Sequence, residues 1–439
     1  MNTENKDEIS EESELIKRRQ QYFAGSYLFF KNPVNFVKGQ GIWLFDEQGR
    51  RYLDCYNNVA SVGHCHPKVV EAISSQVATL NTHTRYLHKQ IINYSEHLTS
   101  TMPPGLDVCF YTCTGTEANE LAMRIARCVS GHHGAIVIEH SYHGNSTLIG
   151  ELSASMYPAT NRPDYVATVE PPNTYRGSYR LGKGMTETEL AKRYAQQTDT
   201  AIDQLTEAGH GVAAFMCDSI FDSQGTLNAP QGYFKQVYER VHTAGGLCIA
   251  DEVQSGFGRL GDHMWGFEHH DVVPDIVTLG KPMGGGHPVA GVVTSREIAD
   301  QFMQNVFYFN TFGGNPVSAA AAESVLTVIE EEGLQQTVRD VGAYLRSRLD
   351  ELAKKHPLIG NIRGKGLFIG LELVKDTETL EPATEAYSVV EKMKDNGILI
   401  SATGRFGNVL KVRPPLIFSR ENADLLIEKL AIVLSELTI

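Results

Sequence analysis

Short apolar runs alternate with longer amphipathic stretches through the middle of the chain. The runs are rich in β-branched and aromatic residues and end in polar ones, which predicts strands at residues 107–111, 135–138, 212–216, 247–250, 276–280 and 289–293. Helical periodicity follows Thr114 and also covers residues 186–208. This alternation predicts an α/β fold, in which helices cover a large and mostly parallel sheet.

The two ends of the chain predict a second, smaller domain. Residues 42–45 and 51–53 flank a turn-rich segment and are expected to form a hairpin. Beyond residue 312 we expect a long alanine-rich helix, followed by helices at 334–356 and 386–395 and by strands at 367–371, 398–400 and 409–412. The predicted division is an N-terminal arm with part of a small α+β domain (1–61), a large domain (62–312), and a connecting helix with the rest of the small domain (313–439).

The first twenty residues fit two descriptions. They can form a charged helix with Ile9, Leu15 and Ile16 on one side, or a frayed and solvated arm. They lack the apolar core of a signal peptide, and no stretch of the chain is long and uncharged enough to cross a membrane. We therefore expect a cytoplasmic protein.

Charge and cysteine content exclude further classes of protein. The 439 residues carry a net charge of −13, which argues against a nucleic-acid partner held through its phosphates. The seven cysteines include no Cys-x-x-Cys pair and predict reduced thiols rather than a disulfide framework. His64, Cys65 and His66 lie together, but no carboxylate motif completes a metal site around them. We expect structural roles for these three residues and no metal.

Two predicted strands end in the residues with the most distinctive chemistry. The run 247–250 leads directly into Asp251, and the run 276–280 leads into Lys281, which is followed by Pro282 and three glycines. Open α/β sheets place their sites at the carboxyl ends of the strands. The pair fits either a buried ion pair or a pyridoxal phosphate (PLP) site, where the lysine forms a Schiff base with the aldehyde and the aspartate keeps the pyridine nitrogen protonated.

The motifs around this pair resemble those of the fold-type I, class III PLP-dependent aminotransferases. The segment 251–259, DEVQSGFGR, is similar to the aspartate motif of that family. Residues 278–281, TLGK, followed by three glycines at 284–286, are similar to its lysine motif. The resemblance extends from about Gly41 to the C-terminus, and several spaced motifs in the expected order are far more specific than one short pattern.

The resemblance implies roles for the residues that hold the cofactor. Lys281 carries PLP and moves protons, while Asp251 faces the ring nitrogen. Gly115 and Thr116 follow a predicted strand and open a helix, where free N–H groups suit a phosphate, and the resemblance assigns them to the PLP phosphate.

Four further residues are implied to surround the cofactor. Tyr142 stacks on one ring face, Val253 covers the other, and Gln254 reaches the ring hydroxyl oxygen. Thr311 binds the PLP phosphate of the neighbouring subunit. This implies a homodimer, or a dimer of dimers, with shared active sites.

The substrate side is less clearly marked. Asn57 and Asn58 are implied to line the substrate entrance, and Arg413 matches the position that often holds the acid group of the substrate. Arg176 is a second candidate because an arginine can bind a phosphate with two hydrogen bonds. One segment departs from the family, since Cys217-Asp218-Ser219 stands where many members have a Glu-Pro pair. This departure argues against ordinary amino-acid specificity.

Three functions remain open within this family. The sequence is similar to the ethanolamine-phosphate phospho-lyase branch at residues 57–60, 174–177, 286–290 and 309–318. We therefore expect a PLP-dependent phospho-lyase that converts a small phosphorylated amine, O-phosphoethanolamine, to acetaldehyde, ammonia and phosphate. The alternative is an aminotransferase that passes an amino group from an amine or amino acid to pyruvate or glyoxylate. A non-catalytic regulator would need a nucleic-acid-binding module or a lost lysine, and the chain shows neither.

Overall fold

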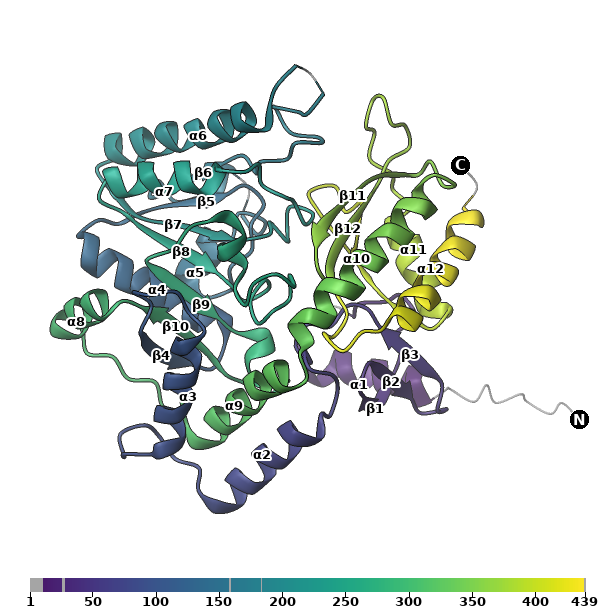
Figure 1. Ribbon diagram of the computed structural model, residues 1–439, viewed down its shortest axis with the longest axis horizontal. Helices are drawn as coiled ribbons and strands as arrows, with labels where there is room; N and C mark the ends of the chain where they lie inside the picture. Colours follow the sequence, from purple (N-terminus) through teal and green to yellow (C-terminus); the bar gives the residue numbers. More distant parts are fainter. Residues whose placement is uncertain (1–10, 26–27, 158, 183, 438–439) are drawn as a thin grey trace, which may run out of the picture.

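The computed structural model describes residues 11–25, 28–157, 159–182 and 184–437. A seven-stranded sheet forms the large domain, in the order β4-β10-β9-β8-β7-β5-β6 (Figure 1). Its strands are β4 (Val108–Thr112), β5 (Gly134–Ile138), β6 (Val166–Val169), β7 (Val212–Asp218), β8 (Leu247–Asp251), β9 (Ile276–Leu279) and β10 (Ala290–Thr294). β10 runs antiparallel to both of its neighbours, whereas the pairs from β9 through β6 are parallel. The expected α/β fold with a mostly parallel sheet is confirmed.

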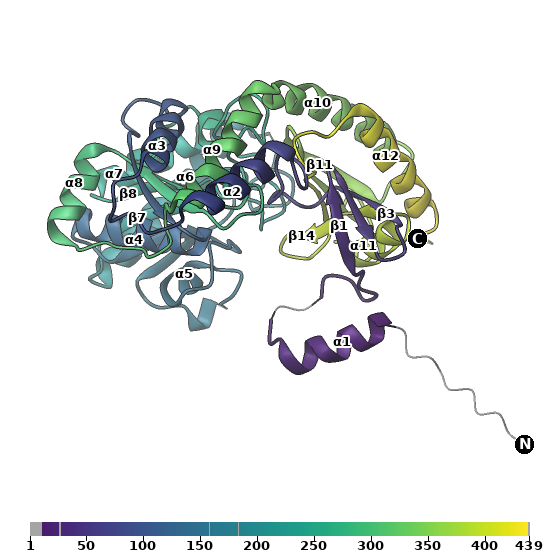
Figure 2. The ribbon, with the colours of Figure 1, turned by 90° about the horizontal axis from the view of Figure 1, so that it is seen from below.

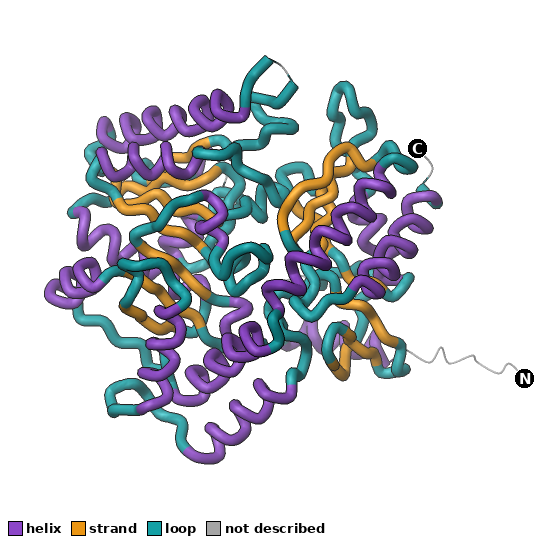
Figure 3. Tube along the Cα trace, in the orientation of Figure 1, coloured by secondary structure: helices purple, strands orange, loops and turns teal. Residues whose placement is uncertain are grey.

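Helices cover both faces of this sheet. Alternate residues of β5 pack into different cores: Ala135 and Val137 join one apolar cluster, and Ile136 and Ile138 join another. The first cluster includes α4 (Gly115–Ser130), α5 (Thr147–Leu152) and α8 (Arg296–Asn305). The second includes α6 (Glu187–Glu207) and α7 (Tyr233–Thr243), which lie together above the sheet in Figures 1 and 3. A strand buried on both sides explains the continuous apolar runs of the sequence.

The small domain is built from both ends of the chain. One sheet has the order β1-β2-β3-β13 and comprises β1 (Phe36–Gln40), β2 (Trp43–Asp46), β3 (Arg51–Asp54) and β13 (Ile398–Leu399). The other has the order β11-β12-β15-β14 and comprises β11 (Ile359–Lys365), β12 (Phe368–Leu373), β15 (Val409–Val412) and β14 (Ser401–Thr403). The parallel pairing of β13 with β3 joins the two chain ends. The predicted hairpin is confirmed as β2–β3, while the division at residues 61 and 312 stays a prediction.

Long helices complete the small domain and join it to the large one. They are α10 (Leu334–Ala353), α11 (Ala386–Asp395) and α12 (Arg420–Ser435) in the small domain, and α2 (Pro67–Thr79) and α9 (Pro316–Glu331) between the domains. α3 (Lys89–Ser100) packs on α9 and on β4 of the large domain. α9 is the expected alanine-rich helix, and Asn315 caps it by accepting a hydrogen bond from Ser318 N at 2.9 Å. Short 3₁₀ turns occur at η1 (Ala159–Asn161), η2 (Gly266–His270) and η3 (Lys281–Gly284).

The N-terminal segment projects away from both domains. Its helix α1 (Glu11–Tyr22) stands apart from the body of the molecule in Figure 2. Of the two descriptions that the sequence left open, the described part adopts the helix, and Ile9 lies outside the described residues. None of the described helices combines the length and the apolar character that a membrane span requires.

Candidate active site

A pocket of about 230 Å³ opens where the parallel strands of the large sheet end. It is lined by residues from β8, the start of α4, the turn after β9, and the loops that follow β5, β7 and β8, namely Thr114, Gly115, Thr116, Asn119, Tyr142, His143, Gly144, Asp218, Asp222, Ser223, Asp251, Val253, Gln254 and Lys281. The structure therefore brings together every predicted cofactor residue except Thr311.

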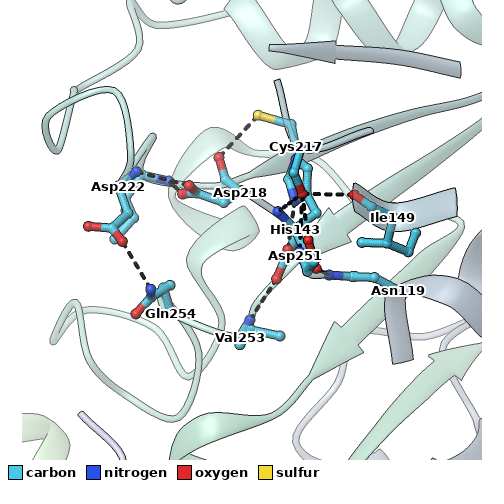
Figure 4. A network of polar contacts seen from close by, with 12 residues as sticks. Asn119, His143, Ile149, Cys217, Asp218, Asp222, Asp251, Val253 and Gln254 are labelled. Atoms are coloured by element: carbon cyan, nitrogen blue, oxygen red, sulfur yellow. Dashed lines mark hydrogen bonds and ion pairs between the residues drawn. The ribbon is translucent and has the colours of Figure 1, made fainter. Parts of the chain in front are cut away.

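Three hydrogen bonds hold the carboxylate of Asp251 in this pocket (Figure 4). Its Oδ2 accepts hydrogen bonds from Asn119 Nδ2 at 2.9 Å and from His143 Nδ1 at 2.7 Å, and its Oδ1 accepts one from Val253 N at 3.1 Å. Burial raises the pKa of Asp251, but these donors from His143 and Asn119 and the charge of Lys281 outweigh burial, so that its pKa lies below its usual value. The group is a fixed carboxylate at neutral pH.

Lys281 begins the η3 turn directly after β9. Its φ of 22° is positive, and a lysine adopts such a backbone only when the surroundings hold it there. Burial, followed by the positive charge of Arg413, lowers the pKa of Lys281 to about 8, although Asp251 and Asp222 act in the opposite direction. A substantial fraction of this amine is therefore unprotonated near neutral pH, as a nucleophile or a base requires.

The N-terminus of α4 offers the pocket an anion site. Thr114 and Glu117 form a capping box, in which Thr114 Oγ1 accepts from Glu117 N at 3.2 Å and Glu117 Oε2 accepts from Thr114 N at 3.2 Å. Among the described residues, the N–H groups of Gly115 and Thr116 donate to no protein group. A Cβ on Gly115 would lie 3.1 Å from Val253 Cγ2, so a side chain there would crowd this wall of the pocket.

Tyr142 and Thr311 lie at the margin of the site. Tyr142 lines the pocket and is 48% exposed, so one edge of the pocket faces outward. Thr311 is exposed and does not line the pocket of its own chain. Its expected role requires a second subunit and stays a prediction.

A second layer of charged groups lies behind Gln254. Lys411 Nζ donates to both oxygens of Asp222, at 3.0 and 3.2 Å, and Gln254 Nε2 donates to Asp222 Oδ2 at 2.9 Å. Gln254 Oε1 accepts from Asn58 Nδ2 at 2.8 Å and also from Arg413 Nη1. Although burial opposes it, the charges of Lys411 and Arg413 lower the pKa of Asp222 below its usual value. This network fixes Gln254 between the two domains.

None of the four predicted substrate residues lines this pocket. Arg413 is only 3% exposed, and its Nε donates to Tyr56 O at 3.1 Å in addition to its bond with Gln254. Asn57 shapes the neighbouring loop, because its Oδ1 accepts from Val59 N at 3.0 Å. Neither residue lines the 230 Å³ pocket. Their predicted contacts with substrate stay predictions.

Arg176 lies in a different cavity. This cavity has a volume of about 720 Å³ and separates the ends of β5 and β6 from the small domain. There Arg176 Nε donates to Glu372 Oε1, and Nη1 donates to Leu380 O. Glu372 also accepts from Arg363. Arg176 therefore links the two domains in this structure, while its Nη2 has no hydrogen-bond partner among the described residues. Its role as a phosphate ligand stays a prediction.

The segment that departs from the family forms a polar turn at the end of β7. Asp218 Oδ1 accepts from Ile220 N at 2.8 Å, and its Oδ2 accepts from Asp222 N at 2.9 Å. Burial and the neighbouring charge of Asp222 raise the pKa of Asp218 to about 7. Ser219 Oγ donates to the buried Glu252 Oε1 at 2.5 Å. The turn thus places Asp222 where it can pair with Lys411.

The sequence interpretation assigned no role to several residues of the site. His143 and Asn119 hold Asp251, and Asp222 and Lys411 form the charged layer behind Gln254. A signal was available for His143, which directly follows the pocket residue Tyr142 at the end of a predicted strand. Asp222 and Lys411 are 189 positions apart, and nothing local in the sequence indicates that they pair.

Comparisons with known proteins cover almost the whole chain. The sequence model of the family described as aminotransferase class-III matches residues 29–434. Alanine–glyoxylate aminotransferase 2-like from Drosophila melanogaster is 45% identical over 94% of this chain and 85% of its own length. Ethanolamine-phosphate phospho-lyase homolog 1 from Caenorhabditis elegans is 40% identical over 94% of this chain and 92% of its own length.

A solved structure agrees with these relatives. It is a phospholyase from Arthrobacter in complex with phosphoethanolamine, which is 42% identical, covers 97% of this chain and 100% of its own, and superposes with a TM-score of 0.93. The family model, the fold and the residues of the pocket therefore all indicate the same protein family. The chain is a PLP-dependent enzyme and belongs to the class III aminotransferase family.

Proposed function

We propose that this enzyme is a phospho-lyase that eliminates phosphate from O-phosphoethanolamine and yields acetaldehyde, ammonia and phosphate. The observation that carries the proposal is the similarity, at 42% identity and a TM-score of 0.93, to a phospholyase whose structure holds phosphoethanolamine. The polar turn at Asp218, which replaces the Glu-Pro pair of many aminotransferases, agrees with a substrate other than an ordinary amino acid.

The pocket fits PLP in size and in donor set. The unpaired N–H groups of Gly115 and Thr116 would hold its phosphate at the positive end of α4. Asp251 would bind the ring nitrogen, because its pKa lies below the usual value and it stays charged. Tyr142 and Val253 would enclose the ring, and Lys281 would hold the aldehyde carbon covalently. When bound, PLP supplies an aldehyde for the substrate amine and a ring that takes up electrons from the neighbouring carbon.

Lys281 supplies the proton transfers in this proposal. With PLP and substrate bound, the free amine of Lys281 would remove a proton from the amine-bearing carbon of the substrate. The low pKa of about 8 keeps this amine unprotonated in a useful fraction of molecules. Asp251 favours the same step, because its negative charge keeps the pyridine nitrogen protonated and the ring electron-poor.

Elimination and transamination share the removal of this proton and differ only in the step that follows it. In elimination, the bond between the second carbon and the phosphate oxygen breaks, and phosphate leaves with the bonding electrons. The remaining two-carbon enamine takes up a proton on its end carbon and becomes an imine. Water then hydrolyses the imine to acetaldehyde and ammonia. A cation that binds the leaving phosphate favours this outcome over reprotonation. Within one chain, Arg413 is the predicted residue for this role, but its Nη1 and Nε already donate to Gln254 and to Tyr56. Asn58 would help to position Gln254, whose Oε1 accepts from Asn58 Nδ2.

We further propose that the active unit is a homodimer, or a dimer of dimers, in which Thr311 of one subunit reaches the PLP phosphate of the other. The exposure of Thr311 and its position outside its own pocket support this arrangement. The alternative chemistry is transamination between an amine or amino acid and pyruvate or glyoxylate. It is favoured by the 45% identity to a relative named alanine–glyoxylate aminotransferase 2-like.

Steady-state assays with two substrate sets distinguish these functions. The purified enzyme loaded with PLP is incubated with O-phosphoethanolamine, and released phosphate and acetaldehyde are measured. In parallel it is incubated with alanine and either glyoxylate or pyruvate. We expect continuous phosphate release in the first assay and much slower turnover in the second. Transamination without any phosphate release would reject the phospho-lyase and establish the alternative.

The pKa of Lys281 predicts how cofactor binding depends on pH. Only the unprotonated amine attacks the PLP aldehyde, so the rate of binding to the cofactor-free protein should rise with pH and level off above about 8. An ordinary lysine, with a pKa of 10.5, would give a rate that still rises well above pH 9. Stopped-flow absorbance with the cofactor-free protein measures this profile.

The charge of Arg413 provides the control for this profile. Because Arg413 lowers the pKa of Lys281, Arg413→Gln should move the plateau to a higher pH. A wild-type rate that still increases up to pH 10 would contradict the assignment of a low pKa to Lys281.

A further inference from the structure

Among the residues that the structure describes, the pocket has no unpaired cation for a substrate phosphate. Lys281 is needed for proton transfer, Lys411 is paired with Asp222, and the Nη1 and Nε groups of Arg413 donate to Gln254 and to Tyr56. Arg176 is held by Glu372 in the other cavity. The proposed substrate carries a phosphate with close to two negative charges at neutral pH, and burying it without a cation is costly. Within a single chain, the site is therefore incomplete.

Arg85 is an exposed arginine that is held in place without a carboxylate partner among the described residues. Its guanidinium carbon lies 4.0 Å from the centre of the Phe309 ring, and its backbone N donates to His83 Nδ1 at 3.2 Å. The His83 ring in turn stacks on Tyr86, with 4.9 Å between the ring centres. The segment is thus ordered around a guanidinium whose N–H groups remain available.

The location of Arg85 connects it to the rim of the site. Its segment packs on the one that carries Thr311, because a Cβ on Gly314 would lie 3.1 Å from Thr84 Cγ2. The Thr311 segment packs on β4, where Tyr308 Oη donates to Tyr111 O at 2.9 Å. β4 is the edge strand of the large sheet and leads directly into the turn at Thr114 that begins the pocket.

The surface around Arg85 is apolar and exposed. Leu87 is 95% exposed, Phe307 80%, Phe312 69% and Tyr86 65%. Apolar surface of this kind on a folded enzyme marks a protein interface. In a two-fold dimer the same surface of both subunits meets, so a patch that lies at the axis beside the pocket rim would face the pocket rim of the other subunit.

We propose that Arg85 crosses this dimer interface and binds the phosphate of the substrate in the active site of the second subunit. The inference rests on the proposed function and adds the cation that each chain lacks. Arg85 enters the partner's active site beside Thr311. Its guanidinium donates hydrogen bonds to the phosphate oxygens and stabilises the negative charge that they gain when the bond to carbon breaks. The residue thereby determines specificity for a phosphorylated amine.

Kinetics of Arg85 variants test the contact with phosphate. Arg85→Ala should lower kcat/KM for O-phosphoethanolamine about a hundredfold, as expected when one partner of a buried charge pair is removed. Arg85→Lys should recover part of the loss, because it restores the charge but not the fork. Binding of an unphosphorylated amine, followed by the change in cofactor absorbance, should be unaffected. The matched control is Lys89→Ala, four positions further along, which should retain wild-type kinetics.

Hybrid dimers test whether Arg85 acts across the interface. Lys281→Ala and Arg85→Ala chains with different affinity tags are co-expressed, and the dimers that carry both tags are purified. If Arg85 acts in the partner, each hybrid dimer has one intact site and one doubly defective site, and phosphate release should return to about half of the wild-type dimer. If it acts within its own chain, both sites are defective and no activity returns.

Each result has a distinct meaning. Absence of recovery in the hybrid dimers, wild-type kinetics for Arg85→Ala, or an equal loss with unphosphorylated amines would overturn the proposal. Size-exclusion chromatography shows whether Arg85→Ala still dimerises, and the milder Arg85→Lys provides the same comparison if it does not. If the wild-type enzyme itself releases no phosphate, the proposed function fails, and that outcome is visible before any variant is made.

Discussion

Lys281→Ala should abolish both turnover and the covalent attachment of the cofactor. The amine of Lys281 is the only group in our account that bonds to PLP and also moves the substrate proton. Loss of a positioned base alone costs about 10²–10⁴ in rate, so we expect a fall in kcat of more than about 10⁴-fold. The protein should no longer show the absorbance of covalently held PLP, and borohydride reduction should no longer fix the cofactor to the chain.

Two observations separate loss of chemistry from loss of structure in this variant. Removal of a buried amine whose pKa is already lowered to about 8 should leave the fold intact, so thermal unfolding of the cofactor-free protein should be nearly unchanged. A small primary amine added in excess should restore part of the rate, since it can act as a base in the space of the missing side chain. Turnover of Lys281→Ala near the wild-type rate without such an amine would refute the role of Lys281.

Asp251→Asn should retain PLP but lose about 10³-fold in kcat. The amide carries no charge to keep the ring nitrogen protonated, and a neutral ring accepts electrons poorly. The local hydrogen bonds add to the effect, because Asn119 Nδ2 and His143 Nδ1 both donate to Asp251 Oδ2 and Val253 N donates to Oδ1. In Asp251→Asn, the amide NH₂ would replace either Oδ1 or Oδ2 and would face an N–H donor, so at least one of these hydrogen bonds would be lost. Single-turnover absorbance and steady-state phosphate release measure the loss.

Asp251→Glu is the matched control for charge. It keeps the carboxylate but lengthens the side chain by one methylene, so it should recover more activity than Asp251→Asn while binding PLP less well. His143→Ala should weaken the enzyme less than Asp251→Asn, because His143 only positions the carboxylate. Near-wild-type kinetics for Asp251→Asn would show that the ring nitrogen is not protonated by this residue.

The candidate pair Asp251 and Lys281 could be located from the sequence because both residues lie at the ends of apolar strands. β8 ends at Asp251 and β9 ends one glycine before Lys281, as the pattern predicts. The turn at Gly115 and Thr116 was visible for the same reason, since the strand β4 leads through it into α4. Local periodicity and strand ends are sufficient for this part of the site, because parallel strands bring their carboxyl ends to one edge.

The remaining contacts depend on distant parts of the chain. Arg413 follows β15 and was predicted to hold the acid group of the substrate, which stays a prediction. No sequence pattern indicated that it would be buried and bonded to Gln254 and Tyr56. The packing of the two domains determines the hydrogen-bond partners of Arg413, and no local sequence pattern predicts this packing. Short strands such as β11, β14 and β6 were also not predicted, because segments of three to seven residues show little periodicity.

The ratio of two products in a single turnover tests the central claim most directly. Enzyme loaded with PLP is mixed with O-phosphoethanolamine, in a smaller amount than the active sites and without any keto acid, and both released phosphate and pyridoxamine phosphate are quantified. Elimination regenerates PLP, so our account predicts one phosphate for each substrate consumed and almost no pyridoxamine phosphate. Accumulation of pyridoxamine phosphate with the substrate phosphate still attached to carbon would contradict it and identify a transaminase.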